Sequence, residues 1–202
     1  MSAGAAVFLD RDGVLNEVVV DALSGLPESP YRAEDVRLTG GAIEALRLLS
    51  ELGLPLAVVS NQPAAAKGTH SREQLAAVHA EVVRQLRAAG IEIAVWRYCL
   101  HHPDGSDPEL GRVCDCRKPA PRLILEAAAE LGVGDLSSSW MIGDSDVDVA
   151  AGRAAGCHTI LVEHAPTAHR RKGGHEPDQR VDDVLAAARC VVQATVRMGE
   201  TA

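Results

Sequence analysis

The chain has 202 residues, a formal net charge of −8, and 47% hydrophobic and 24% charged residues. This length suits one α/β domain over residues 1–202 with a real core. The negative charge argues against nucleic acid or an anionic membrane surface as a partner. No apolar stretch approaches the ~20 residues of a membrane-spanning helix, and the first residues lack the pattern of a secretory signal. We therefore expect a cytoplasmic monomer that acts on a small molecule.

Short apolar segments alternate with helical patterns along the chain. This alternation is typical of a mostly parallel, doubly wound α/β sheet covered by helices on both faces. A capping box of Ser71 and Gln74 marks one helix start. No stretch has room for a large cap domain. Strands are predicted at 5–10, 55–61, 94–99, 139–143 and 158–162, helices at 41–52, 72–89, 121–131, 146–155 and 182–196, and irregular structure at 17–39, 100–119 and 163–180.

Two carboxylates end the first predicted strand. Asp10 and Asp12 are two residues apart, so their side chains point the same way on an extended strand, and Gly13 lets the backbone turn. Two adjacent acids repel each other unless a cation or a reaction needs them. The functional interpretation is a Mg²⁺ site with a nucleophile, Asp10, and a partner acid/base, Asp12. The alternative is a solvated Asp-Gly turn.

Polar residues also end two further predicted strands, at Ser60-Asn61-Gln62 and at Gly143-Asp144. Ligands of such sheets bind beyond the carboxyl ends of the strands, so we expect one shared site. The Ser60 hydroxyl suits a phosphoryl oxygen, and Asp144 could complete a Mg²⁺ shell. Asp148 could support that shell or the ammonium of Lys118. The alternatives are a polar turn at 60–62 and a helix-capping role for the acids after Gly143.

Two pairs of residues predict a second metal site. Cys99-x-His101 and Cys114-x-Cys116 supply three thiols and one imidazole, which match a closed tetrahedral zinc site of structural type. Zinc would order the 99–118 loop and fix Arg117 and Lys118, which follow Cys116 directly. His102 is an alternative ligand, and free buried cysteines are the alternative to a metal site.

Taken together, these strings resemble the haloacid dehalogenase superfamily of aspartyl-phosphate enzymes. Asp10 and Asp12 match its first motif, and the zinc pairs narrow the resemblance to the branch with heptose bisphosphate and histidinol-phosphate phosphatases. The long loop between the pairs favours the heptose enzymes. The resemblance implies that Asp10, Asp144 and the Asp12 carbonyl hold Mg²⁺. It also implies that the phosphoryl oxygens are held by the residues of the later motifs and their neighbours, Ser60, Asn61, Arg117 and Lys118.

The implied activity is removal of the 7-phosphate of D-glycero-D-manno-heptose 1,7-bisphosphate. Arg117 and the 17–39 loop would hold the sugar and its remote phosphate. A histidinol-phosphate phosphatase, or another sugar or polyol phosphate phosphatase, is the second candidate; a phosphosugar-binding protein without catalysis and a phosphotransferase are further alternatives. Val14 and Ser145 depart from the usual motifs, which affects substrate identity more than catalysis. The basic 163–180 stretch is expected to be a solvated loop.

Overall fold

The structure, a computed structural model, describes residues 4–21 and 25–199. The predicted domain also takes in residues 1–3, 22–24 and 200–202, which lie outside the described part. A six-stranded sheet has the order β5-β4-β1-β6-β7-β8, and every neighbouring pair is parallel. Its strands are β1 (Val7–Leu9), β4 (Leu56–Asn61), β5 (Val95–Cys99), β6 (Trp140–Gly143), β7 (His158–Val162) and β8 (Gln179–Val181).

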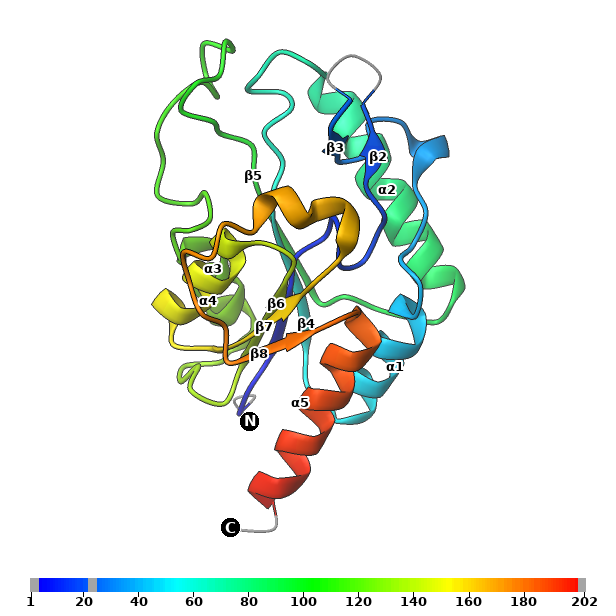
Figure 1. Ribbon diagram of the computed structural model, residues 1–202, viewed down its shortest axis with the longest axis vertical. Coiled ribbons are helices and arrows are strands. Elements are labelled where there is room, and N and C mark those ends of the chain that lie inside the picture. The colour runs from blue at the N-terminus through cyan, green and yellow to red at the C-terminus, as the bar shows by residue number, and fades with distance from the viewer. Residues whose placement is uncertain (1–3, 22–24, 200–202) are drawn as a thin grey trace.

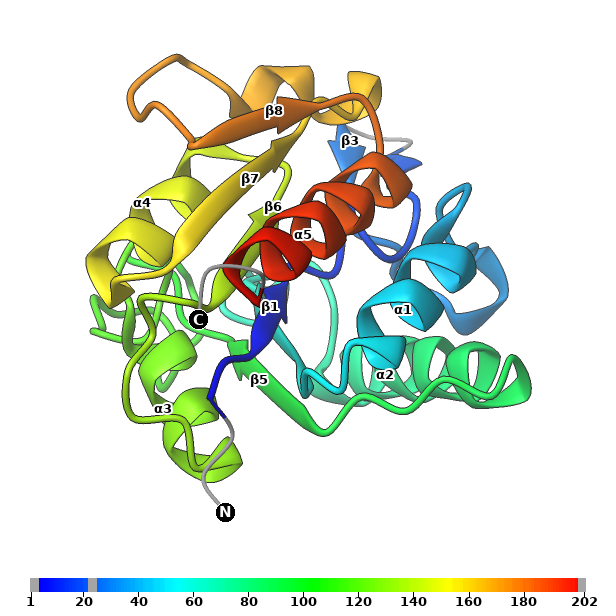
Figure 2. The same cartoon turned by 90° about the horizontal axis from the view of Figure 1, so that it is seen from below.

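Helices cover both faces of this sheet, as predicted (Figure 2). Alternate residues of a strand point to opposite faces. In β1, Val7 and Leu9 belong to one buried cluster and Phe8 belongs to another. The first cluster includes residues of α1 (Ala42–Glu51), α2 (Arg72–Ala88) and α5 (Val184–Gly199), and the second includes residues of α3 (Arg122–Leu131) and α4 (Asp146–Ala155).

The five predicted strands and five predicted helices are confirmed with small shifts of their ends. The capping box is confirmed as well: the Gln74 N–H donates to Ser71 Oγ at 3.2 Å, and the Ser71 N–H donates to Gln74 Oε1 at 2.8 Å. Local side-chain chemistry therefore fixes where α2 begins.

The predicted irregular stretches contain more structure than expected. Within 17–39, strands β2 (Val19–Val20) and β3 (Pro27–Glu28) form an antiparallel hairpin, followed by a short 3-10 helix, η1 (Ala33–Asp35). Within 163–180 lie a second 3-10 helix, η2 (Ala165–Arg170), and β8. The strand β8 escapes prediction because it is short, polar and at the sheet edge.

No cap domain interrupts the described residues: besides α1, α2 and α3, the connections that follow β1, β4 and β5 hold only a hairpin, a 3-10 turn and loops (Figure 1). Among the helices of the described part, none is long and apolar enough to cross a membrane.

Candidate active site

Three neighbouring strands, β4, β1 and β6, end at the same edge of the sheet and bring the predicted polar residues together. Beyond this edge lies a cavity of about 540 Å³. The cavity mixes carboxylates with cations, and its lining residues come from six separate parts of the chain. Its charged and polar lining residues are Asp10, Asp12, Glu28, Ser29, Asn61, Lys67, Arg117, Lys118, Ser145, Asp148, His169, Arg170 and Lys172.

Lys118 lies at the floor of the site and is buried. Its Nζ is 2.9 Å from Asp10 Oδ1 and 2.6 Å from Asp148 Oδ1, and it donates to the Val59 carbonyl at 2.7 Å. Burial lowers the pKa of the ammonium, but the two carboxylates outweigh burial and raise it above its ordinary value. Lys118 is therefore charged at neutral pH and holds Asp10 in place.

Asn61 positions this lysine through its backbone. The Lys118 N–H donates to Asn61 Oδ1 at 3.0 Å, and Asn61 Nδ2 donates to the Lys118 carbonyl at 3.0 Å. Both polar atoms of the amide are thus engaged with Lys118, while Asn61 still lines the cavity. Ser60, at the same strand end, is buried and forms a hydrogen bond to Asp10. Burial raises the pKa of Asp10 above its ordinary value, and Lys118 and this hydrogen bond offset only part of the rise.

Asp10, Asp144 and Asp148 each offer a carboxylate oxygen, and these three atoms lie within 4.8 Å of one another. Neither Asp144 oxygen has a hydrogen-bond partner, although the residue is fully buried. Burial, together with Asp10 and Asp148, raises the pKa of Asp144 to about 8. Buried carboxylate oxygens gathered so closely, with those of Asp144 accepting no hydrogen bond, suit a hard divalent cation. The trio includes Asp148, which the sequence analysis considered only as support.

Two glycines allow these acids to approach. Gly13 has a φ of +89°, and a Cβ there would lie 2.3 Å from Asp144 Oδ2. At Gly143 a Cβ would lie 2.1 Å from the Cβ of Asp148. Any side chain at either position would collide with the acid beside it, so the site needs glycine at both.

The carboxylate of Asp12 accepts hydrogen bonds from four side chains. Arg11 donates from Nε and Nη2 at 3.1 Å each, Asn16 at 2.9 Å, Ser29 at 2.8 Å and Gln62 at 2.6 Å. Burial raises the pKa of Asp12, but Arg11 and the hydrogen bonds outweigh it and hold the pKa below its ordinary value. Asp12 is therefore a carboxylate at neutral pH.

The sequence analysis did not identify three of the side chains that bind Asp12, namely those of Arg11, Gln62 and Ser29. Arg11 is almost fully buried, and Gln62 receives a further hydrogen bond from it at 2.8 Å. The one sequence signal for Arg11 is its position between two acids at the end of an apolar strand. Ser29 comes from the hairpin region, so its contact depends on tertiary structure.

The expectation of a solvated loop at 163–180 is wrong for part of it. His169, Arg170 and Lys172 line the cavity, and the Arg170 side chain is only 23% exposed. A run of basic residues is most often a solvated surface, and its sequence gives no sign that it folds back over the site.

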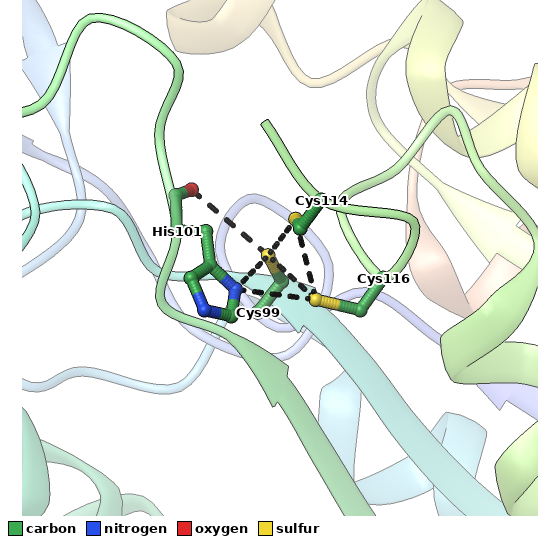
Figure 3. Close-up of side chains that lie close together, drawn as sticks. All are labelled: Cys99, His101, Cys114 and Cys116. Atoms are coloured by element: carbon green, nitrogen blue, oxygen red, sulfur yellow. Dashed lines mark hydrogen bonds between the residues drawn. The ribbon is translucent and has the colours of Figure 1, made fainter. Parts of the chain in front are cut away.

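The four predicted zinc ligands lie together (Figure 3), and none of them lines the cavity. The sulfur–sulfur distances are 3.6 Å for Cys99–Cys114, 3.3 Å for Cys99–Cys116 and 3.4 Å for Cys114–Cys116. His101 Nδ1 is 3.8 Å from Cys99 Sγ and 3.4 Å from Cys116 Sγ. Tetrahedral zinc with Zn–S bonds of ~2.3 Å separates its sulfurs by about 3.8 Å, so the cluster is close to the required size.

The alternative ligand does not belong to this cluster. His102 Nδ1 instead accepts a hydrogen bond from the Asp104 N–H at 3.1 Å. The pairing of Cys99 with His101 is therefore the arrangement found in the structure.

Comparisons with known proteins add independent information. A family model described as HAD-hydrolase-like matches residues 115–187. A D-glycero-beta-D-manno-heptose-1,7-bisphosphate 7-phosphatase of Yersinia pestis is 36% identical over 157 residues, which cover 78% of this chain and 79% of that protein. The protein with the same name from Pseudomonas aeruginosa is 34% identical over 190 residues, covering 93% and 97%.

Solved structures show the same fold. A D,D-heptose 1,7-bisphosphate phosphatase from B. bronchiseptica, complexed with magnesium and phosphate, superposes with a TM-score of 0.76. It is 27% identical in sequence, and the match covers 94% of this chain and 98% of that one.

Proposed function

The chain belongs to the haloacid dehalogenase-like hydrolases, in the family of the heptose-1,7-bisphosphate 7-phosphatases, and we propose that it removes the 7-phosphate of D-glycero-D-manno-heptose 1,7-bisphosphate. The observation that carries this proposal is the Asp10–Lys118 pair at the floor of a cavity lined by further cations. We further propose that the enzyme acts as a cytoplasmic monomer.

Magnesium fits the acidic trio, since carboxylate oxygens are its preferred ligands and neither oxygen of Asp144 accepts a hydrogen bond. Asp10 and Asp144 would hold it, with the main-chain carbonyl of Asp12 as the further ligand inferred from the family motif. When bound, Mg²⁺ reduces the repulsion between the Asp10 carboxylate and the phosphate. The magnesium in the B. bronchiseptica structure supports this proposal.

Asp10 is the proposed nucleophile. One of its carboxylate oxygens attacks phosphorus, the bond from phosphorus to the sugar oxygen breaks, and an aspartyl-phosphate forms. Lys118 remains beside Asp10 and neutralises negative charge as the phosphoryl group arrives. Ser60 keeps the Asp10 side chain oriented, and Asn61 keeps Lys118 in position.

Asp12 is the proposed acid and base. It first gives a proton to the departing sugar oxygen and then takes one from the water that hydrolyses the aspartyl-phosphate. Its four hydrogen-bonded neighbours favour the ionised form, which suits the second step. A phosphate dianion in the cavity raises the pKa of Asp12, because like charges repel. Bound phosphate therefore favours the protonated Asp12 that the first step needs.

The remote phosphate of a bisphosphate needs a second cationic region. Arg117 and Lys67 lie on the cavity wall formed by the zinc loop and the turn after β4. Arg117 is held there by a hydrogen bond from Nη1 to the His101 carbonyl at 3.3 Å. We propose that these cations select a sugar with two phosphates. Histidinol phosphate carries one phosphate and would leave this region without an anionic partner.

We also propose that Cys99, His101, Cys114 and Cys116 bind Zn²⁺. The role is structural, because four protein ligands leave no open position for water. Zinc would connect the end of β5 to the segment that carries Arg117 and Lys118.

The test is phosphate release from both anomers of the heptose bisphosphate, from sugar monophosphates and from histidinol phosphate, with and without Mg²⁺. We expect Mg²⁺-dependent release that is fastest with the bisphosphate. Asp10→Asn should lower kcat by at least about a thousandfold, whereas Asp135→Asn, an exposed carboxylate outside the cavity, should behave as wild type. Equal rates for histidinol phosphate and the bisphosphate would contradict the substrate assignment.

A further inference from the structure

The segment after β7 is fixed against the catalytic edge of the sheet by specific hydrogen bonds. Arg171 donates from Nη1 to the Asp144 carbonyl at 3.1 Å and from Nη2 to the His164 carbonyl at 3.0 Å. The Asp146 carboxylate accepts from the Lys172 N–H at 2.6 Å and the Gly174 N–H at 3.3 Å. The segment is therefore a built wall of the cavity.

Arg170 projects from this wall toward the acidic trio. Its Nη1 lies 3.5 Å from Asp144 Oδ2, and the side chain lines the same cavity as Asp10 and Lys118. Within residues 4–21 and 25–199, Arg170 is the cation paired with Asp144, and no hydrogen bond engages its guanidinium. Most of its N–H donors thus remain free for an anion.

This position has two electrostatic consequences. A guanidinium so close to Asp144 opposes a divalent cation that uses the same carboxylate, because like charges repel. The same guanidinium attracts a phosphate, whose oxygens match the planar set of N–H donors. A phosphate in the cavity would therefore offset the repulsion between Arg170 and the cation.

We propose that Arg170 is a phosphate-binding residue that makes cation and phosphate bind cooperatively. It weakens binding of the cation alone and strengthens binding of phosphate beside the cation. By linkage, each ligand then raises the affinity for the other by the same factor. The identity of the phosphate rests on the proposed function, but the coupling between cation and phosphate does not depend on which sugar is the substrate.

Isothermal titration with MgCl₂ alone, and with inorganic phosphate at saturating Mg²⁺, tests this proposal. In Arg170→Ala we expect Mg²⁺ alone to bind at least about threefold more tightly, since the opposing charge is gone. Phosphate should bind roughly tenfold more weakly, since a charge-assisted contact is lost. Arg84→Ala, which removes an exposed guanidinium on α2, should change neither affinity.

Arg170→Lys separates charge from shape. It should keep the wild-type affinity for Mg²⁺ alone and show an intermediate phosphate affinity, because lysine lacks the planar fork. This variant also serves if Arg170→Ala fails to fold. Weaker binding of Mg²⁺ alone in Arg170→Ala, or an unchanged phosphate affinity, would overturn the proposal. If no sugar phosphate is hydrolysed while the coupling still depends on Arg170, the proposed function fails and this inference stands.

Discussion

Single residues decide how closely the acids of this site can approach one another. Gly13 and Gly143 each lie against an acid of the trio, at distances that no side chain permits. The site also has little unused hydrogen-bonding capacity: Lys118 has three acceptors, and Asp12 has four donor residues. The oxygens of Asp144 are an exception: they accept no hydrogen bond and have only the ion pair with Arg170, which is why we expect the cation there.

Replacing Gly13 with alanine tests this reading. The new Cβ would lie 2.3 Å from Asp144 Oδ2, so the carboxylate must move away from Asp10. We expect Gly13→Ala to lose the thermal stabilisation that wild type gains from Mg²⁺, together with most of its activity. The backbone strain at φ +89° adds about 1–2 kcal/mol of instability.

A matched variant separates strain from the collision. Gly53→Ala introduces a similar strain at φ +72°, but nothing lies within 4 Å of the new Cβ. It should lose stability while keeping the rise in Tm with Mg²⁺. A Gly13→Ala protein that still responds to Mg²⁺ like Gly53→Ala would show that Asp144 is not a ligand.

At the scale of elements, the loop between β5 and α3 connects two proposed metal sites. Cys116 and Lys118 are two residues apart, and Asn61 holds the Lys118 backbone from the end of β4. The zinc-bound loop would therefore hold Lys118 in position from one side, and Asn61 at the end of β4 would hold it from the other.

Removing one zinc ligand should affect both stability and catalysis. Structural zinc contributes ~10–16 kcal/mol in peptide sites, so Cys116→Ser should release zinc and lower Tm. We also expect kcat to fall by at least about tenfold, because catalytic groups must be held in position. The measurements are zinc content, Tm and kcat. Cys190→Ser, a cysteine of α5 outside the cluster, should retain zinc and activity.

Asp178 adds side-chain hydrogen bonds to the backbone pairing of the edge strand β8 with β7. The Asp178 carboxylate accepts from the Thr159 N–H at 2.7 Å and from the Thr159 hydroxyl at 3.0 Å. Burial raises its pKa, but these hydrogen bonds and the charge of Arg153 outweigh burial and lower it. A carboxyl whose pKa is lowered by folding adds stability above its unfolded pKa and loses that contribution as the pH falls.

Asp178→Asn should therefore lower Tm at neutral pH. The difference in Tm from wild type should shrink as the pH falls below the ordinary carboxyl pKa and through the lowered pKa at which the native carboxylate is itself protonated. Thermal melts of both proteins across this range provide the measurement. A difference in Tm that is the same at every pH would mean that the charge of Asp178 is irrelevant.

For the whole molecule, the sequence was sufficient to predict those strands and sites that a local residue pattern marks. The strands ending at Asp10 and Ser60 were predicted because an apolar run stops at polar residues, and the metal cluster because its ligands come in close pairs. The neighbours of Asp12 and the approach of Arg170 to Asp144 depend on how distant segments fold together. No local spacing encodes them.

If Asp10 carries the covalent intermediate, as proposed, the walls of the cavity determine what can react with it. The hairpin, loops, the first turn of α4 and η2 border the cavity, so within the described residues no separate domain covers the proposed acyl phosphate on Asp10. Alcohols compete poorly with a solvent present in such excess, and inorganic phosphate can depart without waiting for a domain to swing aside. On the proposed mechanism, the intermediate is therefore expected to react with water, and the residues at the rim of the cavity are left to recognise the sugar.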